Sequence, residues 1–100
     1  MRHYIADLSK HVGQTVELRG WVYNVRSSGK VKFLLLRDGT GIAQCIFFKG
    51  ECSDEAFENF AKLTQESSLS VTGVVKEEKR SPGGYEISAK ELKKIGRAHV

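Results

Sequence analysis

Five segments of the chain largely alternate hydrophobic with polar residues, and turn-forming residues separate them. The segments are residues 14–26, 30–37, 42–48, 67–80 and 85–95. In the first, Val16, Leu18 and Val22 alternate with charged residues, which is the period of a strand that buries one face. Gly20 and Gly73 lie inside two of these segments, and a glycine within a long strand often marks a bend or a bulge. We therefore expect a protein built mainly of strands.

Turns and helices account for the remaining pattern. The expected turns are residues 27–29, 38–41 and 81–84, and Asp38-Gly39 is a strong hairpin signal. A short helix is expected over residues 5–12, ended by Gly13. The stronger helix covers residues 53–63, where Ser53 is a suitable N-cap. Its apolar residues recur at helical spacing and are expected to pack on the core: Ala56, Phe57, Phe60 and Leu63.

The order of these elements is three strands, a helix and two more strands. Five strands with a helix between the third and the fourth is the arrangement of the OB-fold, a partly open Greek-key barrel. We therefore predict an all-β fold with one or two short helices. The 100 residues fit one small domain, expected to cover residues 1–95, with residues 96–100 as the start of a linker or tail.

Composition narrows the class of protein further. Hydrophobic residues make up 40% of the chain and there is one proline, which is typical of neither disordered nor low-complexity sequences. No apolar run approaches the roughly 18 residues of a membrane-spanning helix, and the N-terminal stretch lacks the apolar core of a signal peptide. Two cysteines, Cys45 and Cys52, do not make a disulfide scaffold. We expect a reduced, cytoplasmic protein without a membrane partner.

Charge is unevenly distributed along the chain. Residues 51–66 hold five acidic residues and one lysine and sum to −4. Because the whole chain carries +4, the other 84 residues sum to +8. One acidic segment in an otherwise basic domain suits a protein with one face toward a polyanion, although a solvated surface of mixed charge would have the same composition.

The second and third strand patterns place an unusual set of residues on one face. Alternation puts Ala43, Cys45 and Phe47 on the face toward the core. The opposite face of the strand pair carries Phe33, Gln44, Ile46 and Phe48. An OB-fold binds oligonucleotides on the face of its second and third strands, between the loops after the first and fourth. We interpret this face as a binding surface for single-stranded nucleic acid, whose bases stack on aromatic rings in a basic groove.

Four side chains on or beside this face have suitable chemistry. Phe33 is the candidate stacking platform, and Gln44 carries an amide that can both donate to and accept from the Watson–Crick edge of an unpaired base. Arg26, at the end of the first strand, can pair with a phosphate or form a fork with a base. Glu86, at the start of the fifth strand, can accept from a guanine edge. Lys30 and Lys32 flank this region, and three further basic residues enter the loop between the fourth and fifth strands: Lys76, Lys79 and Arg80.

Each of these residues also has a simpler interpretation. A register shift of one residue would bury Phe33 in the core. Gln44 taken alone suits an ordinary surface position, and Glu86 taken alone suits a cross-strand charge partner. The hypothesis of a binding surface therefore depends on several side chains converging on one face of one fold.

Catalytic chemistry is poorly supported. His3, His11 and His99 are scattered along the sequence without metal-ligand spacing, and no serine lies in a nucleophile-elbow motif. The DGTG stretch is too short for a phosphate-binding loop and lacks its lysine. We expect no catalytic site, no bound metal and no cofactor in these 100 residues.

The stretch VGQTVELRGWVYNVRSSGKVKFLLLRDGTGIAQCIF resembles the N-terminal anticodon-binding domain of class IIb aminoacyl-tRNA synthetases, which are the aspartyl, asparaginyl and lysyl enzymes. The shared pieces are GWV in the first strand, the basic turn, F-x-x-L-R-D and G-x-x-Q. The similarity covers nearly the whole chain and is specific through the combination of these pieces. SSGK and LLLRDGTG are most similar to the asparaginyl type, with the aspartyl type second.

The resemblance implies roles for individual residues. Phe33 matches an aromatic residue that stacks on the central uridine of the anticodon, and Gln44 matches a glutamine that reads the edge of that uridine. Arg26 matches an arginine that contacts the same region, and Glu86 matches an acidic residue implicated in recognising the first anticodon base. Ile46 departs from an aromatic residue found in some aspartyl enzymes, so a second stacking contact is not implied there.

The resemblance also implies a larger enzyme around this domain. In the family, a catalytic domain follows, uses ATP and Mg²⁺ to form an aminoacyl-adenylate, and transfers the amino acid to tRNA. These enzymes are homodimers, mainly through that domain. We therefore expect a tRNA anticodon-loop-binding domain of an asparagine-tRNA ligase, monomeric by itself and without catalytic activity.

Two other functions fit the same fold. A stand-alone OB-fold could bind single-stranded nucleic acid without sequence preference, and would discriminate little between anticodon loops that differ at the central base. An OB-fold could instead serve as a protein-interaction scaffold, and would show no salt-dependent binding of nucleic acid.

Overall fold

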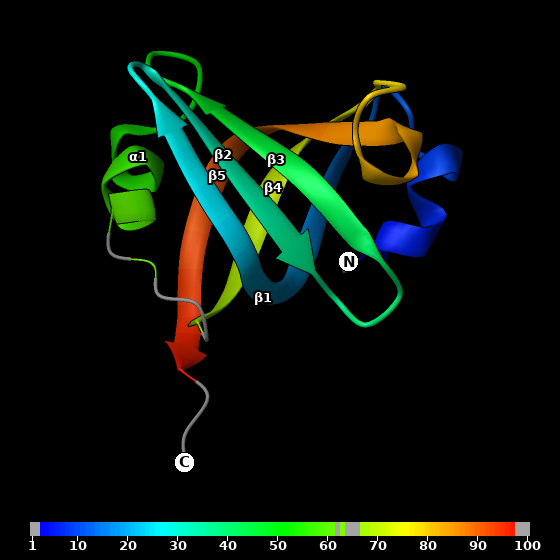
Figure 1. Cartoon of the computed structure of the whole chain (residues 1–100), viewed down its shortest axis with the longest axis horizontal. Helices are drawn as coiled ribbons and strands as arrows, with labels where there is room; N and C mark the ends of the chain where they lie inside the picture. The colour runs from blue at the N-terminus through cyan, green and yellow to red at the C-terminus, as the bar shows by residue number, and fades with distance from the viewer. Residues whose placement is uncertain (1–2, 62, 64–66, 98–100) are drawn as a thin grey trace.

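A closed barrel of five strands forms the body of the protein (Figure 1). The computed structural model describes residues 3–61, 63 and 67–97. The strands are β1 (Thr15–Ser28), β2 (Val31–Arg37), β3 (Ile42–Phe48), β4 (Ser67–Glu77) and β5 (Tyr85–Arg97). They follow each other around the barrel in the order β1-β2-β3-β5-β4, and among these described strands only β3 and β5 pair in parallel. With helix α1 (Asp54–Ala61) between β3 and β4, the predicted all-β fold and OB-fold order are confirmed.

The inward faces of the strands fill the barrel. The predicted alternation on β3 is confirmed, because Ala43, Cys45 and Phe47 are fully buried. On β2, Leu34 and Leu36 are fully buried as well. Hydrophobic burial of this kind is the main favourable contribution to folding.

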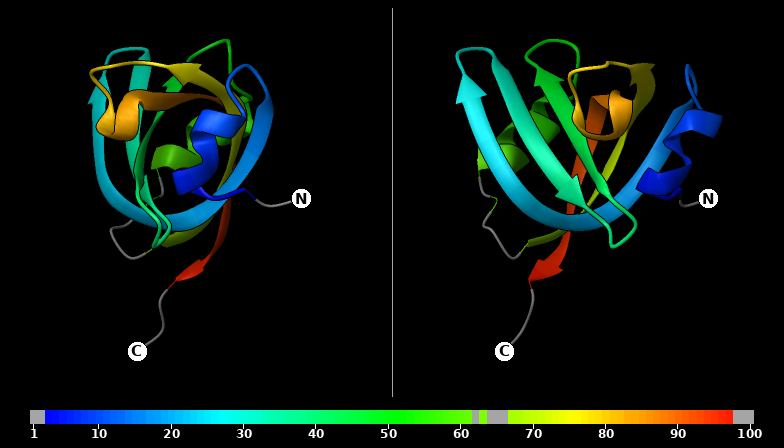
Figure 2. Two further views of the ribbon diagram at one scale, coloured as in Figure 1. Left: turned by 90° about the vertical axis from the view of Figure 1, so that its right-hand side faces the viewer. Right: turned by 45° about the vertical axis from the view of Figure 1, so that its right-hand side comes forward.

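Helix α1 packs on the barrel beside β5, as the views in Figure 2 show. The predicted N-cap is confirmed, since the Ser53 Oγ accepts a hydrogen bond from the Ala56 backbone N–H at 3.0 Å. The helix ends at Ala61, earlier than predicted. Leu63 is not helical; its N–H donates to the Phe60 carbonyl, and its side chain still packs against the core. Phe60 contacts Phe47 with 5.8 Å between ring centroids.

Both interior glycines lie where strands approach closely. A Cβ on Gly20 would lie 2.2 Å from the Arg37 carbonyl oxygen, at the point where β1 stops pairing with β4 and begins to pair with β2. A Cβ on Gly73 would lie 2.4 Å from the Ser88 carbonyl oxygen, and the β4–β5 register shifts beside it. The register shift confirms a bulge at Gly73, and at both positions only glycine fits without backbone movement.

Several predicted boundaries were wrong at their ends. Residues 27–29 are not the first turn, because Ser27 and Ser28 continue β1 and pair with β2, so that the chain reverses at Gly29 and Lys30. The first helix is a 3₁₀-helix, η1 (Ile5–Lys10), followed by a bridge from Val12 to Val75. Strand β4 ends at Glu77, and a short 3₁₀-turn, η2 (Pro82–Gly84), precedes β5. Strand β5 continues to Arg97, and the domain boundary expected at residue 95 stays a prediction.

The described helices include none that is long and apolar enough to cross a membrane.

The two cysteines differ in their surroundings, and we expect them to differ in reactivity. Burial raises the pKa of the Cys45 thiol to about 12, and also raises the pKa of Cys52, which is only half-buried. Since the thiolate is the reactive form, iodoacetamide at pH 8 should alkylate Cys52 of the folded protein and leave Cys45 unmodified. Mass spectrometry after digestion should show both modified only in denaturant. Rapid labelling of Cys45 in the folded protein would contradict its burial.

Candidate nucleic-acid interface

The outward face of β1, β2, β3 and β5 carries two adjacent rows of side chains. Strand pairing sets Arg26 opposite Phe33, Phe33 opposite Ile46, and Ile46 beside Ser88. The second row is formed by Asn24, Leu35, Gln44 and Glu86. Directly paired residues share one face of a sheet, so the two rows form a continuous surface. We call this surface the outer face.

Phe33 lies on the outer face and outside the core. Its neighbours Leu34 and Leu36 are buried on the opposite side of β2, while Phe33 is half-buried and not part of the core cluster. The guanidinium of Arg26 lies 4.7 Å from the centroid of the Phe33 ring. This is a cation–π contact that holds an arginine over one face of a half-buried aromatic ring. The predicted register is confirmed, and the alternative that Phe33 belongs to the core is excluded.

A pocket of about 100 Å³ opens beside this pair. Its lining is formed by Asn24, Val25, Arg26, Phe33, Leu35 and Gln44. Gln44 is half-buried, and its amide makes no hydrogen bond to another described residue. An unused amide beside an aromatic ring can hydrogen-bond the edge of a base that stacks on that ring.

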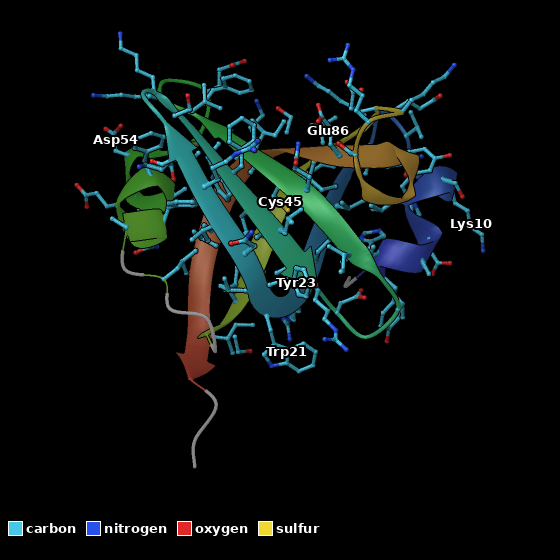
Figure 3. The ribbon with its side chains drawn as sticks, in the orientation of Figure 1. Lys10, Trp21, Tyr23, Cys45, Asp54 and Glu86 are labelled. Atoms are coloured by element: carbon cyan, nitrogen blue, oxygen red, sulfur yellow. The ribbon has the colours of Figure 1, made fainter. Side chains whose placement is uncertain are left out.

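Glu86 lies next to Gln44, as the parallel pairing of β3 with β5 sets the two residues side by side, and Figure 3 shows Glu86 where β5 begins. Ser81 donates its hydroxyl to a Glu86 carboxylate oxygen at 3.4 Å. Lys76 is the partner of Glu86 on β4, yet the described ion pairs do not include these two residues. The carboxylate therefore retains acceptor capacity toward a ligand.

The two flanking loops carry exposed cations. Lys30 lies in the turn after β1, where its carbonyl accepts from the Lys49 N–H at 2.9 Å. Lys79 and Arg80 lie in the loop after β4, which is braced by a bond of 2.9 Å from the Glu78 N–H to the Gly84 carbonyl. The structure forms no ion pair with Lys30, Lys79, Arg80 or Arg26 in its described part. These cations are free to meet phosphate groups.

Lys32 does not belong to this surface, and its expected place there was wrong. It lies on the same side of β2 as Leu34, at the end of the barrel, where its ammonium group covers the rings of Phe57 at 5.0 Å and Phe60 at 5.3 Å. The cause is the alternation of the strand itself, which separates Lys32 from Phe33. Ile46 is nearly buried at 9% exposure, whereas Phe48 at the end of β3 is 37% exposed.

Two of the histidines are closer than their sequence positions indicate. The rings of His3 and His11 contact edge-to-face with 4.6 Å between centroids. Residues 3–61, 63 and 67–97 contain no group of three or more side chains that could hold a metal ion. His99 lies outside the described residues.

A larger pocket of about 580 Å³ lies between η1, residues 40–42 and residues 83–85, and none of the predicted binding residues lines it.

Sequence reasoning missed Asn24, Val25 and Leu35 as members of the pocket. A signal for Asn24 was present, because it lies two residues before Arg26 and shares its face along an extended strand. What obscured it is a bulge. The pairing of β1 with β2 shifts by one residue between Val22 and Asn24, so Val22 faces the core and Asn24 faces outward.

Comparison with known proteins agrees with this geometry. Residues 16–95 match the family model of the OB-fold nucleic acid binding domain. The asparagine–tRNA ligase of Chloroflexus aurantiacus is 46% identical over 95 residues, which cover 95% of this chain and 22% of that protein. The crystal structure of asparaginyl-tRNA synthetase from Pyrococcus horikoshii complexed with asparaginyl-adenylate is 38% identical with a TM-score of 0.88, covering 98% of this chain and 23% of that chain. OBody AM3L09 bound to hen egg-white lysozyme is 27% identical with a TM-score of 0.84, covering 96% and 95%.

The chain belongs to the family of OB-fold nucleic acid binding domains. It is homologous to the N-terminal region of asparaginyl-tRNA synthetase and spans about a fifth of the length of the ligases that it matches. The resemblance expected from the sequence is thereby confirmed.

Proposed function

We propose that this domain binds the anticodon loop of a tRNA on its outer face. The observation that carries the proposal is the pocket in which an accessible Phe33 ring, the Arg26 guanidinium above it and the unpartnered Gln44 amide meet. Sequence-specific recognition of RNA targets unpaired bases, which stack on aromatic or guanidinium planes and hydrogen-bond through their edges. The homology to asparaginyl-tRNA synthetase supports the anticodon loop as the single-stranded target.

The position of each side chain suggests its role. Phe33 stacks on the central uridine, Gln44 hydrogen-bonds the edge of that base, and Arg26 contacts the base or its phosphate. Glu86 lies one strand further along the same row and accepts from the first anticodon base. Lys30, Lys79 and Arg80 bind phosphates on either side, because they are exposed and unpaired in the described part of the structure.

The second part of the proposal concerns the enzyme to which the domain belongs. We infer that the domain serves an asparagine-tRNA ligase, in which ATP and Mg²⁺ act in a separate catalytic domain and which assembles as a homodimer in the cytoplasm. The identity of 46% to a ligase of this specificity supports the asparaginyl type over the aspartyl type. The outer face explains recognition of a central uridine and does not itself select the amino acid.

Protein binding is the second candidate. The OBody bound to lysozyme matches this chain over nearly its whole length, so a barrel of this form can present a face to a protein. The exposed cations around the pocket favour RNA over protein. They form no ion pair with acidic side chains in the described part of the structure, so they can bind phosphate groups. The net charge of +4 also suits a polyanionic partner such as RNA.

Binding to short RNA stem-loops, followed by fluorescence anisotropy at low and moderate salt, tests the proposal. The loops carry the anticodons GUU, GUC and UUU, with a control in which the central uridine is replaced. We expect binding that requires the central uridine and falls with salt, with GUU preferred over GUC for an asparaginyl-type domain. Equal binding to every loop would indicate a general single-strand binder, and absence of binding would leave the protein-binding function.

Lys30→Ala should weaken the binding of all stem-loops alike. Loss of one phosphate contact removes one counterion-release term, so the slope of log affinity against log salt should flatten by at most about one unit. The ratio of affinities for loops with and without the central uridine should not change. A salt slope equal to that of the wild type would remove Lys30 from the contact surface.

A further inference from the structure

The amide of Asn24 has a fixed orientation. Its Oδ1 accepts a hydrogen bond from the Val25 backbone N–H at 2.9 Å. Strand β1 pairs with β4 only as far as Trp21, so residues 24–28 have a partner strand on one side alone, immediately after the bulge. Within the Asn24 amide only the oxygen can accept this N–H, because the nitrogen is a donor. This bond turns the oxygen toward the backbone of β1 and sets which end of the amide is the nitrogen.

The other end of the same amide is donor-only. The Asn24 Nδ2 carries two N–H groups and makes no hydrogen bond to another described residue. Asn24 is exposed and lines the pocket that also contains Phe33 and Gln44. The pocket is thus lined by the Gln44 amide, which makes no hydrogen bond to another described residue, and by the Asn24 amide, whose oxygen already accepts from the backbone and whose Nδ2 has two unused N–H groups.

This difference is relevant to pyrimidine recognition. The 4-position of uracil or thymine carries a carbonyl oxygen, which accepts, whereas the same position of cytosine carries an amino group, which donates. The Nδ2 of an amide pairs with the carbonyl, whereas it would oppose the amino group of cytosine with another donor. Such an unsatisfied polar contact discriminates strongly between two bases of nearly equal size.

We propose that Asn24 is a specificity-determining residue, whose Nδ2 donates to the 4-carbonyl of the pyrimidine held between Phe33 and Gln44 and so selects uracil over cytosine. The inference rests on the proposed function, because it requires the anticodon loop to enter this pocket. Asn24 would supply selectivity that the stacking on Phe33 cannot supply, since stacking alone tolerates every base.

Asn24→Asp tests the proposal with a nearly isosteric change. The aspartate can still accept from the Val25 N–H, so the bulge is retained, but its second oxygen is an acceptor. The affinities for stem-loops with the anticodons GUU and GCU are measured in parallel, because their ratio cancels the general effect of an added negative charge. We expect the preference for the uridine loop to fall at least about fivefold, which corresponds to the loss of one hydrogen-bonded discrimination.

Two further variants complete the experiment. Asn24→Ala removes the donor without adding charge and should also lower the uridine preference. Gln14→Glu makes the same amide-to-carboxylate change immediately before β1, where the Gln14 side chain hydrogen-bonds His11 at 3.0 Å, and should leave the ratio unchanged. Thermal melting establishes that each variant is folded.

The outcomes separate this inference from the proposed function. A wild-type domain that prefers the uridine loop, together with an unchanged ratio in both Asn24 variants, would overturn the role of Asn24 and leave anticodon binding intact. A wild-type domain without any preference for the uridine loop would overturn the proposed function, and with it the role of Asn24.

Discussion

Phe33→Ala is expected to weaken the binding of a GUU stem-loop by roughly 1–3 kcal/mol, the contribution of one base stacked on an aromatic ring. That range corresponds to a roughly 5- to 150-fold rise in Kd. The free energy of unfolding should change by about 1 kcal/mol or less, because the ring lies outside the core and is already half in solvent. Fluorescence anisotropy gives the Kd, and urea denaturation gives the stability.

Phe33→Tyr is the matched control for this experiment. It keeps an aromatic plane under the Arg26 guanidinium, so binding should remain within a few-fold of the wild type while Phe33→Ala loses it. A Phe33→Ala protein that is unfolded would mean that the ring supports the core. A folded Phe33→Ala protein with unchanged affinity would remove base stacking from the account.

Phe47→Ala should have the reverse effect, with a loss of about 3–5 kcal/mol in the free energy of unfolding. Phe47 is fully buried on the inward face of β3 and contacts Phe60 of α1. Removal of the ring leaves a cavity at the contact between the barrel and the helix. The expected loss is a large share of the roughly 5–15 kcal/mol that stabilises a domain of this kind.

The comparison of Phe47 with Phe33 separates folding from binding. Urea denaturation at 25 °C should show a clear fall in the midpoint for Phe47→Ala, whereas the folded fraction should bind the GUU stem-loop with nearly wild-type affinity. Phe47→Leu, which fills more of the cavity, should lose less stability than Phe47→Ala. A Phe47→Ala domain as stable as the wild type would contradict the burial of this ring.

The inner strands of the site could be predicted because their neighbours fix the register. On β3, the small and apolar side chains of Ala43, Cys45 and Phe47 define one buried face, so Gln44 must point the other way. On β2, the same reasoning places Phe33 outward. The fold class could be predicted from the order of the strands and helices along the chain. That order does not change when the end of a single element is placed one or two residues wrongly.

The first strand was less predictable because its faces exchange. Val16, Leu18 and Val22 face inward at even positions, and simple alternation would send Asn24 and Arg26 inward as well. The bulge at residue 23 adds one residue to β1 relative to β2 and turns those two side chains outward. No local residue signal marks the bulge, since it arises from pairing with a strand that lies further along the chain. Arg26 was found by its chemistry and resemblance, and Asn24 was not found.

The lysines near the first turn were the other residues whose positions the sequence did not predict correctly. The sequence shows that Lys30 and Lys32 are close to the first turn, but a lysine can extend its aliphatic stem along apolar surface. Lys32 does so over Phe57 and Phe60, which come from a helix that the local sequence of β2 cannot reveal. Tertiary packing thus decides which lysine meets the ligand.

The central claim, that the outer face of β1, β2, β3 and β5 binds the anticodon loop, is tested most directly by an NMR titration. Amide resonances of the ¹⁵N-labelled domain are followed as a GUU stem-loop is added, with a loop lacking the central uridine as control. We predict that the largest shifts belong to Asn24, Arg26, Phe33, Gln44 and Glu86, and that they are much smaller with the control. Shifts concentrated instead around Trp21 and Ile95, which are exposed on another side of the barrel, would contradict the account.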